Sequence, residues 1–168
     1  MPTNNKITLK KANIEDIDKE VEFIKKIPLL ENGFANFFFN VLHKNKEEIL
    51  NYVLSLNYSI ESIPIYTYFL WIDDKIVGMY HILSRLTEDQ KQKDGHISYT
   101  ILKQYRGKGY GTIGLSLMIE EAKKIIPEDE IYMHTTINNP ASLKMMLKNN
   151  AYIIKNDEFG IFTRIKIK

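Results

Sequence analysis

The segment with the clearest chemical potential is Gln104 to Gly111, which reads Gln-Tyr-Arg-Gly-Lys-Gly-Tyr-Gly. It lies between a β-rich run and a stretch with helical spacing. Glycines at alternate positions remove side chains where a backbone amide must approach a ligand closely. The start of a helix adds unpaired amides and the positive end of the helix dipole, which together bind anions. The sequence therefore predicts a phosphate-binding turn, with Arg106 and Lys108 as additional positive charge.

Two nucleotide-binding motifs compete for this segment. A P-loop requires Ser or Thr after its Gly-Lys pair, whereas Lys108 is followed by Gly109, which has no hydroxyl for magnesium. The stretch from Gly109 to Gly114 does match the dinucleotide pattern G-x-G-x-x-G, and two acids lie about 20 residues further on. Those acids precede the next predicted strand instead of ending it. A dinucleotide-linked oxidoreductase therefore stays as a minor alternative.

The elements that must position this turn follow from hydrophobic periodicity. Strands are predicted at residues 7–10, 66–72, 75–83, 95–102 and 131–136, and twice within 151–168 around Asn156-Asp157. Helices are predicted at 12–26 with Asn13 as the cap, and at 38–56, 109–126 and 140–148, while the charged residues 87–94 read as a turn. This order predicts an α/β fold of the mixed-sheet type, a single domain over residues 1–168. Its central sheet has about six or seven strands, with helices on both faces.

The composition excludes several classes of protein and site. The chain has no cysteine, which excludes disulfides, thiolate metal sites and an acyl-enzyme formed through sulfur. No apolar run approaches the ~18 residues of a membrane span, so we expect a cytoplasmic protein without a membrane partner. A net charge of +2 is too small to predict a nucleic-acid partner, and no paired spacing of ligands predicts a metal site.

Four segments carry a resemblance to a known family. At its strand-to-helix junction, Gln104-x-x-Gly107-x-Gly109 resembles the Gln/Arg-x-x-Gly-x-Gly/Ala signature of the GNAT superfamily of acetyltransferases. The run Asn139-Pro140-Ala141-Ser142 resembles the Asn-x-x-Ser at the start of that fold's next helix. Residues 95–99 resemble the Gly-His-Ile-Gly-Tyr run of a poorly characterised bacterial branch, and residues 31–34 resemble its amino-terminal half. The resemblance implies a GNAT-like fold and transfer of an acetyl group from acetyl-CoA to an amine.

The same resemblance implies where acetyl-CoA binds. Its pyrophosphate would lie on the backbone amides from Arg106 to Gly111. Its pantetheine arm would lie along the strand before the loop, like an added strand, which requires a sheet that splays at this point. The cofactor-binding residues expected in these two segments are Ile101, Leu102, Gln104, Arg106, Gly107, Lys108, Gly109, Tyr110 and Gly111.

The start of the next predicted helix supplies two further cofactor-binding candidates. By resemblance, Asn139 approaches the pantetheine or the substrate, and Ser142 lies near the cofactor arm. In the alternative interpretation Asn139 is only the N-cap of the helix, with Pro140 at its first position.

His96 is the candidate general base. An amine that attacks a thioester must lose a proton, and a histidine with an ordinary pKa near 6.5 suits that step. Strand alternation puts His96 on the face opposite Ile97 and Tyr99, so it faces a cleft if those two face the helices. By resemblance it takes the position where many relatives carry a glutamate base. The alternative is a hydrogen-bonded structural histidine.

The general acid has no clear candidate. Many relatives have a tyrosine four residues after the serine of Asn-x-x-Ser, where this chain has Met146, which cannot donate a proton. Tyr152 and Tyr110 are the nearest tyrosines in sequence, and solvent is the third option.

The acceptor is expected to be a small-molecule amine, ahead of a protein amino terminus or lysine. Glu31, Asn32 and Phe34 are the candidate substrate-binding residues, because the first two helices of a GNAT fold border the acceptor site; a buried turn is the alternative. A different class of function, a non-catalytic acyl-CoA-binding regulatory module, stays open because of Met146. Edge strands at the carboxyl end would allow a homodimer.

Overall fold

The computed structural model describes residues 5–28, 30–31, 34–35, 43–54, 57–58 and 63–168. Its helices are α1 (Ile17–Lys25), α2 (Lys46–Leu54), α3 (Glu88–Lys93), α4 (Tyr110–Ile125) and α5 (Pro140–Lys148), with a 3-10 turn at Lys103–Tyr105. Its strands are β1 (Ile7–Lys11), β2 (Leu30–Glu31), β3 (Phe34–Ala35), β4 (Asn57–Tyr58), β5 (Ile63–Ile72), β6 (Lys75–Leu83), β7 (Ile97–Ile101), β8 (Glu130–Thr135), β9 (Tyr152–Asp157) and β10 (Gly160–Lys166). The predicted α/β class is confirmed.

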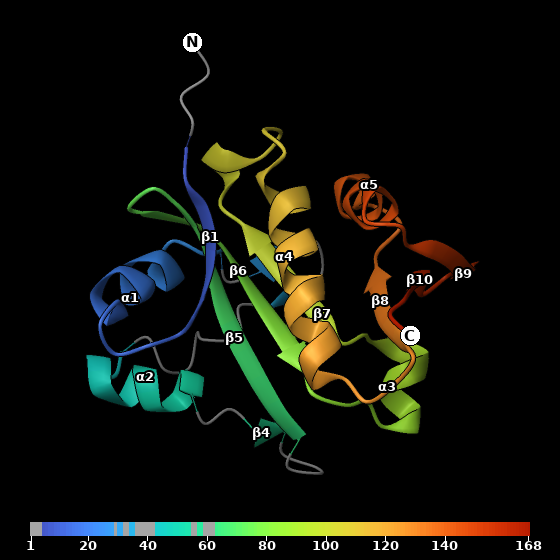
Figure 1. Cartoon of the computed structure of the whole chain (residues 1–168), viewed down its shortest axis with the longest axis horizontal. Coiled ribbons are helices and arrows are strands. Elements are labelled where there is room, and N and C mark those ends of the chain that lie inside the picture. Colours follow the sequence, from blue (N-terminus) through green and yellow to red (C-terminus); the bar gives the residue numbers. More distant parts are fainter. Residues whose placement is uncertain (1–4, 29, 32–33, 36–42, 55–56, 59–62) are drawn as a thin grey trace.

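The strands belong to separate sheets. In the described residues, a five-stranded sheet has the order β1-β5-β6-β7 with β4 beside β5, and a three-stranded sheet has the order β8-β10-β9. The short strands β2 and β3 form a hairpin. Figure 1 shows the three-stranded sheet beside β7, with α4 in front of the larger sheet and leading from β7 to β8. The predicted central sheet is therefore divided at the boundary between β7 and β8.

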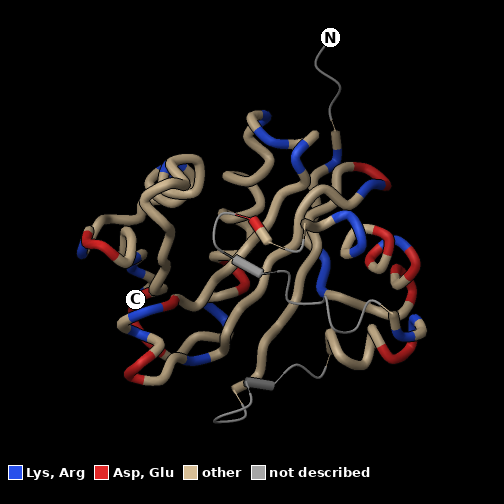
Figure 2. Tube along the Cα trace, turned by 180° about the vertical axis from the view of Figure 1, so that it is seen from behind, with Lys and Arg blue, Asp and Glu red and all other residues tan. Residues whose placement is uncertain are grey.

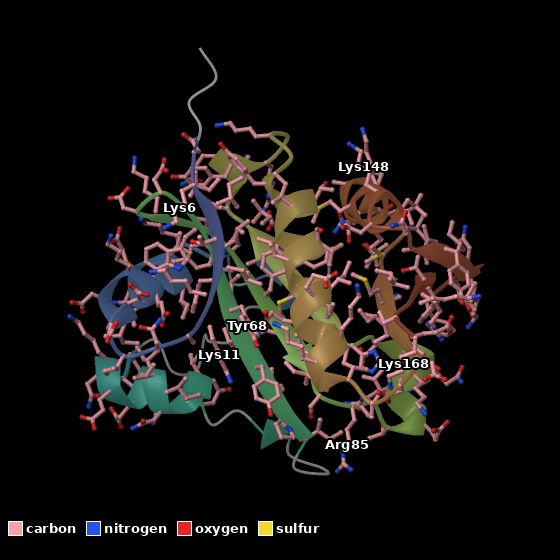
Figure 3. The ribbon with its side chains drawn as sticks, viewed as in Figure 1. Lys6, Lys11, Tyr68, Arg85, Lys148 and Lys168 are labelled. Atoms are coloured by element: carbon pink, nitrogen blue, oxygen red, sulfur yellow. The ribbon has the colours of Figure 1, made fainter. Side chains whose placement is uncertain are left out.

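Each face of the five-stranded sheet has its own core. On one face, Leu115 and Met118 of α4 are buried in a cluster with Leu70 and Tyr80 of the sheet. On the other face, residues of α1 and α2 are buried against alternate residues of β5 and β6. Figure 3 shows charged side chains such as Lys148 at the outer margin of the molecule, away from these cores. Pairing with β6 and packing against α4 therefore hold β7 in place, and the loop that follows β7 starts from a fixed point.

Four local predictions are wrong. Residues 87–94 contain the helix α3, which a capping box between Thr87 and Gln90 stabilises at its start. Helix α1 begins at Ile17 and not at residue 12, because the Asn13 side chain accepts a hydrogen bond from the Asp16 amide at 3.0 Å and turns the chain first. The turn between β9 and β10 lies at residues 158–159. Helix α2 begins at Lys46, and part of the predicted helix, residues 38–42, lies outside the described residues.

The described surface is mixed in charge. Figure 2 shows lysine and arginine interspersed with acidic residues along the helices and turns. None of the helices in the described part of the chain is long and apolar enough to span a bilayer.

Candidate active site

The two larger sheets meet at the start of β7. The His96 amide donates to the Tyr132 carbonyl of β8 at 2.7 Å, and the Tyr132 amide donates to His96 Nδ1 at 2.9 Å. A Cβ on Gly95 would lie 2.5 Å from the Tyr132 carbonyl oxygen, so only glycine allows this close approach. Beyond this junction the sheet pairing of the described residues does not join β7 to β8. The splay that the resemblance requires is therefore present, closed at His96 and open toward Ile101.

The open end of β7 presents backbone groups away from the sheet. The Leu102 amide donates to the Val77 carbonyl of β6 at 3.0 Å, and its carbonyl accepts from Tyr105 at 2.9 Å. Because peptide groups alternate between the two edges of a strand, those of Ile101 face the side away from β6. Of the two residues predicted to pair with pantetheine, Ile101 thus turns its amide away from β6, with its carbonyl accepting from the Arg106 side chain, whereas the Leu102 backbone is paired on both groups.

The loop after β7 has the geometry of an anion site. Gly107 and Gly109 adopt left-handed φ angles of 73° and 85°, and no described atom lies within 4 Å of a Cβ placed on either. Gly109 precedes α4 and has no side chain to cap it, so the first amides of α4 have no partner within the helix. The first turn of α4 contains no acidic residue. These residues fit a phosphate group: open space, free amides and the positive end of a 16-residue helix lie together.

The two positively charged side chains of the loop differ in their hydrogen bonding. Arg106 donates from Nε to the Ile101 carbonyl at 2.8 Å and forms a two-bond pair with the Glu31 carboxylate. Lys108 is exposed, with its ammonium 5.8 Å from the centre of the Tyr105 ring. Gln104 is exposed on the 3-10 turn. Lys108 is therefore the cation of this loop that is free to meet a phosphate, and Arg106 is held.

Hydrogen bonds connect the elements around the open end. The Tyr80 hydroxyl of β6 donates to the Gly111 carbonyl in the first turn of α4 at 3.1 Å. The Tyr99 hydroxyl lies 2.7 Å from the Ser142 hydroxyl in the first turn of α5, and burial raises the pKa of Tyr99 to about 12. Asn139 accepts from the Ser142 amide at 3.2 Å and so is the N-cap of α5. Sequence reasoning missed Tyr99, because nothing in the spacing relates β7 to α5.

His96 does not face a cleft. It is fully buried, and its position just before the β7 ladder places it under β8, so the geometric premise of its prediction is wrong. Its Nε2 lies 3.3 Å from Glu128, and burial lowers the pKa of His96 to about 4 although the Glu128 carboxylate opposes this. The Nδ1 lone pair already accepts the Tyr132 amide, which requires that Nδ1 carry no proton. A catalytic role for His96 stays a prediction.

The residues considered for the general acid make other contacts in the structure. Met146 is 1% exposed, and its sulfur accepts the Thr163 hydroxyl at 3.4 Å. Tyr152 is exposed and bonds Glu130 at the outer sheet. Tyr110 packs beside the core at the start of α4. In the described residues, Tyr99 is the tyrosine whose hydroxyl reaches the first turn of α5.

The predicted acceptor residues lie on the β2–β3 hairpin or outside the described residues. Glu31 pairs through its backbone with Phe34, and its side chain forms the bond pair with Arg106 at 2.9 and 2.6 Å. Phe34 lies on β3, and Asn32 falls outside the described residues. The Arg106 hydrogen bond lowers the pKa of Glu31, so this carboxylate is ionised at neutral pH. A candidate acceptor residue is thus joined directly to the cofactor loop.

Comparison with protein families identifies the chain. The model of the acetyltransferase (GNAT) family matches residues 32–152, which is more than half of the chain. The chain therefore belongs to the GNAT family of acetyltransferases. This membership confirms the predicted family and the predicted enzyme class, an acetyl-CoA-dependent N-acyltransferase. No curated protein sequence matches the chain.

Several solved structures share the fold. A GNAT-family acetyltransferase from Streptococcus pneumoniae is 20% identical, with a TM-score of 0.65 over 97% of this chain and 100% of its own. The aminoglycoside acetyltransferase AAC(6')-Ib, in complex with coenzyme A, is 12% identical, with a TM-score of 0.63 over 96% of this chain and 95% of its own. RimL, a ribosomal alpha-N-protein acetyltransferase in complex with coenzyme A, is 12% identical, with a TM-score of 0.66 over 99% of this chain and 97% of its own. Structures with coenzyme A among them agree with the predicted cofactor.

Proposed function

We propose that this chain transfers an acetyl group from acetyl-CoA to a primary amine of a small molecule, by direct attack within a ternary complex. The observation that carries the proposal is the loop from Gly107 to Gly111. There, two left-handed glycines and an uncapped helix start adjoin Ile101, whose peptide groups face away from β6 and whose carbonyl accepts from Arg106. Phosphate and an extended amide chain are the two ligand chemistries that such a place accepts, and acetyl-CoA contains both.

The donor is held mainly by backbone groups. The free amides at the start of α4 bind the pyrophosphate, and Lys108 adds a mobile positive charge. Ile101 binds the pantetheine arm through its edge. When bound, acetyl-CoA supplies the thioester that makes the acetyl carbonyl electrophilic. Because the chain contains no cysteine, no thioester on the protein can form, which favours direct transfer to the amine.

The buried His96 and the partly buried Tyr99 are assigned different tasks. The Tyr99 hydroxyl stays protonated, since burial raises its pKa to about 12, and it stabilises negative charge at the thioester as a hydrogen-bond donor. His96 is a positioning residue: its bonds to Tyr132 hold β7 against β8 at the closed end of the splay. The amine reaches the thioester in its neutral form, and as its nitrogen bonds the acetyl carbon the carbon–sulfur bond breaks. Water takes the proton from the amine and supplies one to the departing coenzyme A thiolate.

A small acceptor is favoured by the position of Glu31. The Arg106 guanidinium bonds both this carboxylate and the Ile101 carbonyl at the end of β7. The Glu31 side chain is 32% exposed, so it offers one negative group to a cationic ligand when Arg106 is displaced. AAC(6')-Ib is by its name an aminoglycoside acetyltransferase, and RimL acts on a protein amino terminus. The single-domain organisation, the cytoplasmic location and a homodimer stay predictions.

Thiol release from acetyl-CoA tests this function. Purified protein is mixed with acetyl-CoA and a panel of small mono- and diamines, aminoglycosides and peptides with free amino termini. Release of free thiol is measured, and the mass of each acceptor is determined by mass spectrometry. We expect saturable release with at least one small amine and a mass gain of one acetyl group. Turnover with peptides alone would replace the small-molecule proposal by a protein acceptor. Tight acetyl-CoA binding without turnover on any acceptor would favour the regulatory module.

A further inference from the structure

Arg106 connects three groups that a bound donor and acceptor would also use. Its Nε donates to the Ile101 carbonyl at 2.8 Å, and its two terminal nitrogens donate to the two Glu31 oxygens at 2.9 and 2.6 Å. The side chains are 40% and 32% exposed, so the pair lies at the surface, where ligands can reach it. A two-bond arginine–carboxylate pair of this kind is geometrically specific but, when exposed to water, only weakly stabilising.

Coenzyme A competes for each of these contacts. Phosphate oxygens bind a guanidinium with the same fork geometry as a carboxylate and carry more negative charge. Arg106 directly precedes Gly107, the first glycine of the phosphate-binding loop, so its guanidinium needs no long movement of the chain to reach a phosphate there. Departure of the guanidinium would also free the Ile101 carbonyl for an amide of the pantetheine arm.

We propose that Arg106 exchanges partners when the donor binds: it leaves Glu31 for a coenzyme phosphate, and the released Glu31 carboxylate binds an ammonium group of the acceptor. This inference rests on the proposed function. It names the acceptor class as a molecule with at least two amino groups, because one must be neutral for attack and another must be charged for Glu31. It also sets the order of binding, with the donor first.

The exchange predicts the direction in which one substitution changes the affinity for coenzyme A. Glu31→Gln removes the competitor for Arg106, so coenzyme A binds about fivefold more tightly, the size expected when a partly exposed ion pair no longer has to break. If the pair instead only braces the loop, Glu31→Gln loosens the loop and weakens coenzyme A binding. Pantetheine, which lacks the nucleotide phosphates, separates the two effects: the exchange predicts a smaller gain in its affinity than in that of coenzyme A.

Isothermal calorimetry on four proteins performs the test: wild type, Glu31→Gln, Arg106→Gln and the double variant. Glu22→Gln is the matched control, because Glu22 is an exposed glutamate that pairs with Lys26 on α1 and its loss changes the net charge equally. We expect tighter coenzyme A binding by Glu31→Gln alone, no change in Glu22→Gln, and no effect of Glu31→Gln once Arg106 is replaced.

A second arm tests the acceptor class. With coenzyme A saturating, 1,4-diaminobutane should bind wild type at least fivefold more tightly than without it, and Glu31→Gln should abolish that difference; butylamine should show none. Equal or weaker coenzyme A binding by Glu31→Gln, or an equal gain with pantetheine, overturns the exchange while the proposed function stands. Failure of the wild type to bind coenzyme A overturns both.

Discussion

The two ends of β7 are built in opposite ways. At its start, His96 is fully buried, and its ring and backbone both hydrogen-bond Tyr132 of β8. At its end, no strand among the described residues pairs with the Ile101 edge that faces away from β6, and the chain continues into a loop whose glycines have open space around them. The closed end depends on side-chain packing and the open end on backbone geometry.

This difference separates structure from function along one strand. The closed end fixes the angle between the two sheets, and the open end uses the resulting space for a ligand. Substitutions at the two ends should therefore affect different quantities. Changes near Gly109 should alter ligand affinity at little cost in stability, and changes at His96 should alter stability at little cost in affinity.

The largest effect is expected for Gly109→Glu. The φ of 85° strains any side chain at this position, and a carboxylate at the phosphate site repels the coenzyme, so affinity for coenzyme A should fall at least ~100-fold. Calorimetry measures the affinity, and circular dichroism confirms the fold. Gly109→Asn is the control, since asparagine tolerates left-handed φ without charge and should lose less than about tenfold. Coenzyme A binding equal to wild type in Gly109→Glu would remove the loop from the site.

His96→Asn should act on the other end. It removes a buried ring and its bond to the Tyr132 amide, and we expect the free energy of unfolding in urea to fall by about 2 to 3 kcal/mol. Coenzyme A affinity should stay within about threefold of wild type. A fall in kcat of more than about 100-fold with unchanged stability and affinity would contradict the structural role of His96, because His96 would then be the general base that the sequence suggests.

The pH dependence of stability sharpens the same contrast. The pKa of His96 is lowered from 6.5 to about 4, so the unfolded chain binds more protons between these values. Stability from neutral His96 is thus complete above about pH 6.5 and is lost as the pH falls toward 4, by up to about 3 kcal/mol. His81, with a pKa of about 4, acts in the same direction, and Glu20, raised to about 7, acts in the opposite one.

The difference in unfolding free energy between wild type and His96→Asn isolates the His96 contribution. Urea titrations at pH 4.5, 5.5, 6.5 and 7.5 should show this difference shrinking steadily as the pH falls. A difference that is constant with pH would mean that His96 is not held neutral by burial.

The smallest effect is expected for Tyr99→Phe. Loss of the hydroxyl beside Ser142 should lower kcat about 10-fold and leave coenzyme A affinity within about twofold, because the donor acts on charge that develops during the reaction. Tyr80→Phe is the matched control: it also removes a buried hydroxyl, but one bonded to the Gly111 carbonyl, and should affect stability more than kcat. An equal loss of kcat in both variants would contradict the assigned role of Tyr99.

Local signals in the sequence predict the open end well. Alternate glycines before a helical pattern predict a helix from residue 109, one residue before the observed start of α4 at Tyr110, and Asn139-Pro140 predicts the N-cap and first residue of α5. These features are visible because glycine, asparagine and proline act on their own backbone. Strand β6 is also predicted with its observed bounds, Lys75–Leu83.

Contacts between distant segments are not predictable in this way. Strand alternation predicts a His96 that faces a cleft, and it gives no sign that the side chain is buried and hydrogen-bonded to Tyr132 of β8. The sequence predicts Arg106 as a phosphate ligand. It does not predict that Glu31, on the β2–β3 hairpin, forms an ion pair with this arginine. The junction of the two sheets depends on the close approach of Gly95 to Tyr132, for which a lone glycine in the sequence gives no signal.

The most direct test of the account follows the backbone amides of the labelled protein by nuclear magnetic resonance during titration with acetyl-CoA. We predict that the amides of residues 107–112 and Ile101 shift in proportion to bound ligand, that those of Gly95 and Tyr132 stay in place, and that NAD changes neither set. Shifts centred on Gly95 and Tyr132, or the same response to NAD, would contradict the assignment of the open end of β7 as the acetyl-CoA site.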